Sequence, residues 1–178
     1  MKPAHTRLPL IFAVYPTARG FGWAALESPL APHSGGLVEV TKDKNVVCLR
    51  KIEALLDQLE PETLVLEAFE RRNSARTDRI SKLCRALVCM ANDRSMEFAI
   101  YTRKDIETCF GTNGARTRHE IAEAIARHVP ALAGRLPTKR AAWKADDRRM
   151  ALFNAAALVF THFRYQAQFF LDEMKGAA

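Results

Sequence analysis

The 178-residue sequence lacks several features that would assign it to a class at once. Its four cysteines form no CxxC pair, and no Cys or His pair has the spacing typical of zinc ligands. No apolar run approaches the length needed to cross a bilayer, and there is no internal repeat or low-complexity segment. We therefore expect a globular protein with no membrane partner. Its cysteines are predicted to be reduced core thiols in a cytoplasmic protein.

Composition fits one folded domain with an excess of positive charge. Hydrophobic residues make up 48% of the chain, which argues against disorder, and the net charge is +7. The length allows a single domain over 1–178, with a core at about 9–163 and a peripheral tail at 164–178. The charge suits an anionic partner such as nucleic acid, but it would also keep an ordinary protein soluble.

Apolar runs separated by turn residues predict strands first, and then strands alternating with helices. Strands are predicted at 10–15, 22–27, 36–40, 63–67 and 98–101, and helices at 46–59, 74–91, 103–109, 117–129 and 147–163. The segment 28–36, rich in Pro, Ser and Gly, is predicted to be a surface loop. Because 63–67 is apolar until its final acid, Glu67, it is predicted to be a central strand buried on both faces.

Two of the predicted helices carry specific signals. Between Val46 and Leu59, apolar side chains recur at helical spacing and predict one buried face. Thr117 followed by Glu120 has the spacing of a capping box, so a helix should begin there. Together these elements predict a mixed sheet with helices on its faces.

Three stretches in order along 9–163 resemble the RuvC-type Holliday junction resolvases, which have an RNase H-like fold. They are LVLEAF at 64–69 with NSAR at 73–76, then IY through GTNGAR within 100–116, and finally ADD through TH within 145–162. The resemblance implies an α/β, RNase H-like, mixed five-stranded sheet flanked by helices. It also implies a homodimer that acts on branched DNA in recombination or repair.

The site that the resemblance implies is incomplete in this chain. The family holds two Mg²⁺ or Mn²⁺ ions with four carboxylates, and only Glu67 clearly matches one of them. Tyr15 stands where the family has an aspartate. It is expected to be a packed side chain at the end of the sheet; the less favoured alternative is a nucleophile that forms a covalent link to DNA. Near the last helix, Asp146 or Asp147 could reach the metals with Asn154 as a neutral ligand, or both acids could merely cap the helix.

Basic residues surround this implied site, and side chains of this kind neutralise phosphates without reading sequence. The candidates for contacting nucleic acid are Arg71, Arg72, Arg76, Arg79, Lys82, Arg116, Arg118, Lys139, Arg140 and Lys144. Phe69, directly after the strand, matches an aromatic residue that can wedge into a junction in the family, although a core or dimer role fits equally well.

The sequence therefore leaves two functions open. One is a divergent Mg²⁺- or Mn²⁺-dependent endonuclease that uses Glu67 with Asp146 or Asp147 and acts on branched or structured DNA. The other is a catalytically inactive relative that kept the fold and the basic groove. An RNA-directed nuclease of the same superfamily is not separated from the first.

Overall fold

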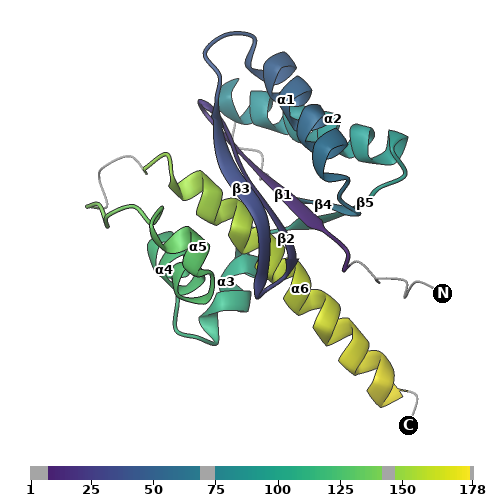
Figure 1. Cartoon of the computed structure of the whole chain (residues 1–178), viewed down its shortest axis with the longest axis vertical. Coiled ribbons are helices and arrows are strands. Elements are labelled where there is room, and N and C mark those ends of the chain that lie inside the picture. The colour runs from purple at the N-terminus through teal and green to yellow at the C-terminus, as the bar shows by residue number, and fades with distance from the viewer. Residues whose placement is uncertain (1–7, 69–74, 142–146, 177–178) are drawn as a thin grey trace, which may run out of the picture.

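The computed structural model describes residues 8–68, 75–141 and 147–176 (Figure 1). Its sheet contains the strands β1 (Ile11–Thr17), β2 (Gly20–Ser28), β3 (Ala31–Glu39), β4 (Thr63–Glu67) and β5 (Glu97–Tyr101). The spatial order is β3-β2-β1-β4-β5. β1, β4 and β5 run parallel, whereas β2 and β3 are antiparallel to their neighbours. The sheet is therefore mixed, as predicted.

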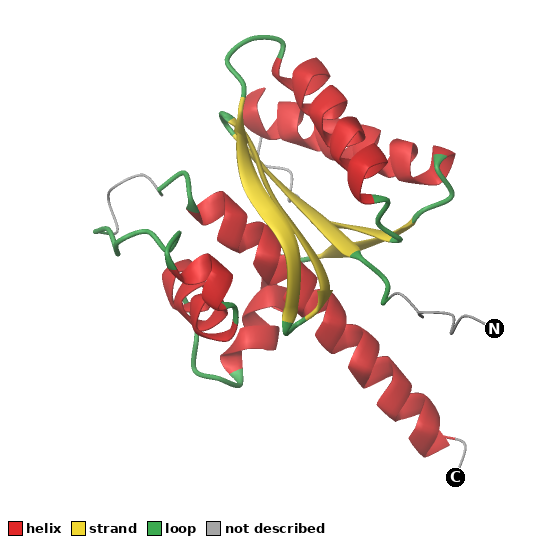
Figure 2. Cartoon of the chain, in the orientation of Figure 1, coloured by secondary structure: helices red, strands yellow, loops and turns green. Residues whose placement is uncertain are grey.

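Helices cover both faces of this sheet (Figure 2). The helices are α1 (Lys44–Leu59), α2 (Ala75–Asp93), α3 (Arg103–Gly111), α4 (Arg118–His128), α5 (Pro130–Ala133) and α6 (Met150–Gly176). α1 and α2 lie on one face and α3 to α6 on the other. Because strand side chains alternate between faces, each face has its own apolar core.

The central strands follow from their sequence. All five residues of β4 are buried, which confirms a strand covered on both faces. The capping box before α4 is also present: Glu120 N donates to Thr117 Oγ1, and Thr117 N donates to Glu120 Oε2 at 2.8 Å. Ile121 and Ile125 of this helix are buried, as its spacing predicted.

The helix α6 lies against the sheet at Gly22 of β2. A Cβ at that position would lie 2.2 Å from the carbonyl carbon of Ala151. The backbone of the helix therefore lies against the strand with no side chain between them, and only glycine fits. This contact fixes how the start of α6 lies over β1 and β2.

Three sequence predictions are wrong in detail. Most of the predicted loop 28–36 belongs to β3, where pairing with β2 outweighs the weak strand propensity of Pro, Ser and Gly. Val46 is 60% exposed, because the buried face of α1 is centred on Cys48 and Ile52. Cys89 is an exposed thiol rather than a core one, although no described cysteine is in a disulfide.

The last helix differs at both ends from the predicted 147–163. It begins at Met150 and continues to Gly176, so the helix runs well past residue 163, and its last turns extend away from the body of the protein (Figure 1). Among the described residues, no helix is both long and apolar enough to cross a membrane.

Candidate functional site

The parallel strands bring three side chains to one edge of the sheet. Val14 is paired with Leu66, and Glu67 with Tyr101, so β1, β4 and β5 end side by side. Alternation along the strands then places Tyr15, Glu67 and Tyr101 on the face covered by α6. We call this the carboxyl edge, since the three parallel strands end there.

Glu67 is a buried carboxyl group at the centre of this edge, with only 9% of its surface exposed. Burial raises its pKa, because the charged form loses solvation, while the positive charges of Arg118 and Arg103 oppose that shift. The negative charge of Glu107 raises the pKa further. Arg103 and Arg118 are the first residues of α3 and α4, so two helix N-termini carry positive charge toward Glu67.

Tyr15 is half-buried and packs against the apolar core beneath α6. It is paired with Gly22 of β2, the glycine on which the backbone of Ala151 rests. Tyr15 therefore lies under the start of α6, in the position where the resemblance implies a metal-binding aspartate. A phenol with an ordinary pKa near 10 is neutral at pH 7 and is a poor ligand for Mg²⁺.

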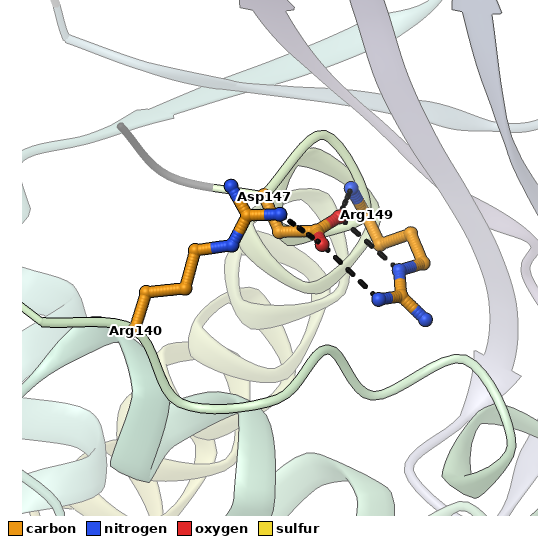
Figure 3. A network of polar contacts seen from close by, with 3 residues as sticks. All are labelled: Arg140, Asp147 and Arg149. Carbon is orange, nitrogen blue, oxygen red and sulfur yellow. Dashed lines mark hydrogen bonds and ion pairs between the residues drawn. The ribbon is translucent and has the colours of Figure 1, made fainter. Parts of the chain in front are cut away.

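Asp147 is held by two arginines just before α6 begins (Figure 3). Its Oδ1 accepts from the backbone and Nε of Arg149, and its Oδ2 lies 3.1 Å from Arg149 Nη2 and 3.1 Å from Arg140 Nη2. Hydrogen bonds from Arg149 are the main reason that its pKa falls to about 2. Because the helix begins at Met150, Asp147 precedes α6 and does not share a helical face with Asn154.

Farther along α6, Asn154 is buried and His162 belongs to an aromatic network. Tyr101 Oη lies 2.9 Å from His162 Nδ1, and the Tyr101 ring stacks on Tyr165 with centroids 5.3 Å apart. The Tyr165 hydroxyl donates to Asp105 Oδ1. The buried Nε2 of His162 has no hydrogen-bond partner among the described residues, and burial lowers the pKa of this histidine.

The predicted basic residues that are described lie on both sides of the carboxyl edge. On the α2 side, Arg79 donates to Thr17 O at the end of β1 and to Asn45 Oδ1, so it joins β1, α1 and α2. Lys82, one turn later, is exposed and lines a shallow pocket of about 500 Å³ with Arg79. Arg76 lies in α2, but its side chain is outside the described part.

On the other side, exposed basic groups gather where α4 begins. Arg116 and Arg118 flank its N-cap, and Lys139 is close enough to lower the pKa of Glu120, after the stronger effect of hydrogen bonds from Thr117 and Arg116. Arg140 is the exposed residue paired with Asp147. The remaining candidates lie outside the described residues: Phe69, Arg71, Arg72, Lys144 and Asp146.

Sequence reasoning missed two residues of this site and one pairing. Arg103 acts on Glu67 from the start of α3, and Tyr101 is the register partner of Glu67. The binding of Arg149 to Asp147 was not predicted either. Arg103 lies two positions after the end of a predicted strand, and this spacing could have placed it near the site. The pairings of Tyr101 and Arg149 depend on strand register and on the turn before α6.

The described donors do not fit a pair of catalytic metal ions. In residues 8–68, 75–141 and 147–176 no three His, Cys, Asp or Glu side chains gather in a group that could hold a metal. Arg118 and Arg103 are close enough to Glu67 to oppose the rise of its pKa, and both oxygens of Asp147 already accept from arginines. Since Mg²⁺ prefers several carboxylates, one buried carboxyl group with a raised pKa and one carboxylate already bound by two arginines do not fit such a pair.

Comparison with solved structures identifies the fold. The chain matches Thermus thermophilus RuvC in complex with a Holliday junction substrate, with a TM-score of 0.67 and 14% identity over 90% of this chain and 96% of that one. It matches Thermus thermophilus RuvC alone with a TM-score of 0.65 and 17% identity, over 89% and 96% of the two chains. The yeast mitochondrial Holliday junction resolvase Ydc2 matches with a TM-score of 0.56 and 13% identity, over 90% and 80%.

These likenesses confirm the predicted α/β, RNase H-like architecture of RuvC type. No protein-family model matches the sequence, and no curated protein sequence matches it. The identities are low, so the comparisons define the fold, and function has to be argued from the site.

Proposed function

We propose that this protein binds branched or structured DNA at the carboxyl edge of its sheet, as a homodimer in the cytoplasm. The observation that carries the proposal is that α3 and α4 begin with Arg103 and Arg118, both close enough to the carboxyl edge to lower the pKa of Glu67. Helix N-termini and arginines both favour phosphate. The fold is shared with a RuvC that was solved with a Holliday junction substrate, which supports DNA as the anion.

The proposed contacts are electrostatic. Arg116 and Lys139 are exposed beside the start of α4, where they can approach a phosphate backbone. Arg79 has a different role in this proposal: its guanidinium binds Thr17 and Asn45 and holds the end of β1 to the helices. Binding is therefore expected to depend on shape and on salt rather than on base sequence.

Metal-dependent cleavage is the second candidate. It is favoured by one observation, that Glu67 stands buried at the end of the central strand where the resemblance implies a metal ligand. It is opposed by Tyr15 at the end of β1 and by the two arginines on Asp147. Mg²⁺ or Mn²⁺ would need Asp146, which lies outside the described residues, as a further ligand.

Binding can be tested with a labelled four-way junction and a matched linear duplex, by anisotropy at several salt concentrations. Arg116→Ala and Lys139→Ala should each weaken junction binding and reduce the slope of log K against log salt by about one. Lys175→Ala is the matched control, since Lys175 is an exposed basic residue at the far end of α6. No binding at low salt, or an equal loss in the control, would refute the proposal.

Cleavage can be tested on the same junction with Mg²⁺ or Mn²⁺. We expect the wild type and Glu67→Gln to bind equally well and neither to cleave. Cleavage by the wild type that disappears in Glu67→Gln, with binding retained, would establish the endonuclease instead. Cleavage that survives in Glu67→Gln would indicate a contaminating nuclease or a different site, and an RNA junction run in parallel distinguishes the nucleic acid.

A further inference from the structure

The carboxylate of Asp147 is enclosed by two arginines, which we call the arginine pair, Arg140 and Arg149 (Figure 3). Arg149 presents Nε to Oδ1 and Nη2 to Oδ2, each at 3.1 Å, and its backbone nitrogen donates to Oδ1 at 2.9 Å. Arg140 Nη2 lies 3.1 Å from Oδ2. Four donors therefore meet two oxygens, in the forked arrangement by which guanidinium groups bind carboxylates and phosphates alike.

The arginine pair carries more positive charge than Asp147 carries negative charge. Two guanidinium groups share this one carboxylate. The pKa of Asp147 is lowered to about 2, chiefly by hydrogen bonds from Arg149, so the carboxylate stays charged at neutral pH. A phosphodiester group has the same single negative charge and also presents two unsubstituted oxygens. It can therefore accept from the same donors as Asp147.

The exposure of the three side chains shows which of them a ligand can reach. The Asp147 side chain is only 14% exposed, whereas those of Arg140 and Arg149 are 48% and 47% exposed. The acid is enclosed and the two guanidinium groups reach solvent. A phosphate group can therefore approach the arginine pair from outside, with no change in the sheet.

The arginine pair also lies beside the surface proposed for DNA. Arg149 is two residues before Ala151, whose backbone rests on Gly22 at the start of α6. Arg140 directly follows Lys139, one of the exposed basic residues near the start of α4. A DNA strand that follows those residues would pass close to the arginine pair.

We infer that the arginine pair is a binding site for a phosphate group of the DNA backbone, and that Asp147 occupies this site in the free protein. The inference rests on the proposed function for the identity of the anion. Asp147 is then a competitor of DNA. Because it is held on the same chain, it competes at an effective concentration on the order of millimolar, and the wild type binds DNA more weakly than its arginines alone would allow.

Removing the competitor should strengthen binding. Without divalent metal, Asp147→Ala should bind a labelled four-way junction about 10-fold more tightly than the wild type, the value of one charge-assisted contact. The slope of log K against log salt should become steeper by about one, since one more phosphate is neutralised. Unchanged or weaker binding with an unchanged slope would overturn the inference.

Asp57→Ala is the matched control. Asp57 also binds an arginine, with Arg94 Nη1 2.7 Å from its Oδ1, and its removal changes the net charge by the same amount. It lies near the end of α1, which leads into the start of β4, whereas the carboxyl edge is where β4 ends. Asp57→Ala should bind the junction like the wild type. An equal gain in both variants would mean that net charge alone is responsible.

Two further variants separate occupation of the site from simple repulsion of DNA. In a chain with Arg140→Ala and Arg149→Ala, adding Asp147→Ala should change the affinity by less than about threefold. The same gain with and without the arginine pair would overturn the inference. Asp147→Asn removes the charge but keeps an acceptor for the Arg149 backbone, so it should show a gain in the same direction even if Asp147→Ala disturbs the turn before α6.

Inorganic phosphate tests the site without DNA. In thermal melts against chloride at equal ionic strength, phosphate at ten times its dissociation constant should raise the Tm of Asp147→Ala by about 3 °C more than that of the wild type or Asp57→Ala. Equal rises in all three proteins would overturn the inference. If no variant binds the junction, the proposed function fails, and a larger rise in Asp147→Ala alone would still establish the phosphate site.

Discussion

Substituting Gly22 by alanine should separate α6 from the sheet and destabilise the protein strongly. The added Cβ would lie 2.2 Å from the carbonyl carbon of Ala151, 2.3 Å from its oxygen and 2.6 Å from the nitrogen of Leu152. All three are backbone atoms, so no flexible side chain can move aside. Restoring ordinary contact requires the helix to shift by roughly 1 Å, in a core that is otherwise closely packed.

Overpacking of this kind costs about 3 kcal/mol in the free energy of unfolding. For a chain of this size, that corresponds to a fall in Tm of roughly 6–12 °C. Urea unfolding followed by circular dichroism measures the first quantity, and a thermal melt measures the second. The shift of α6 also moves Ala151 relative to Tyr15, so the variant should bind the junction more weakly as well as being less stable.

Gly134→Ala provides the matched control. Gly134 follows α5 with helical backbone angles, and a Cβ there would meet no atom within 4 Å. It should change stability between zero and about 1 kcal/mol in the favourable direction, because alanine lowers the entropy of the unfolded chain. If Gly22→Ala unfolds within about 0.5 kcal/mol of the wild type, the close contact between α6 and β2 is wrong.

Three further results are expected. Burial lowers the pKa of His162, so the free energy of unfolding should fall as pH drops below 6.5, the ordinary pKa of histidine. Between pH 7.5 and 5.5, His162→Gln should lose less stability than the wild type. Equal losses in the two proteins would contradict this. The pKa of Asp147 is lowered to about 2, so its contribution to the free energy of unfolding is complete above pH 3.8 and is lost as the pH falls toward 2. At pH 7, Asp147→Asn should lower the free energy of unfolding, measured in urea, by about 1 kcal/mol, and by less in 1 M salt. Tyr15→Asp should bind Mn²⁺ by calorimetry, because the new carboxylate joins Glu67 at the carboxyl edge. Tyr15→Asp combined with Glu67→Gln should bind the ion more weakly, since it has lost one of the two ligands. Equal binding by both variants would exclude Glu67 as a ligand.

Local signals were sufficient for several parts of the fold. The apolar run of β4 and the capping box of α4 act within a few residues, so periodicity and side-chain spacing predict them correctly. The loop predicted at 28–36 failed because a strand at the sheet edge is decided by pairing with β2, and not by its own propensity. The extension of α6 past residue 163 was missed because its apolar side chains Phe169, Phe170 and Met174 are exposed, so this part of the sequence has no buried helical face of the kind that periodicity detects.

Some features of the candidate site could likewise be predicted from the sequence, and others depend on the tertiary structure. The sequence by itself determined that Glu67 ends a buried strand and that basic residues surround it, since both depend on residue type and order. Tertiary structure alone decided which charges meet. Arg118 and Arg103 come close enough to Glu67 to lower its pKa because two helices begin at the same sheet edge, and Arg140 reaches Asp147 from a separate loop. Electrostatic energy depends on distance and burial, and folding fixes both between residues that are far apart in the chain.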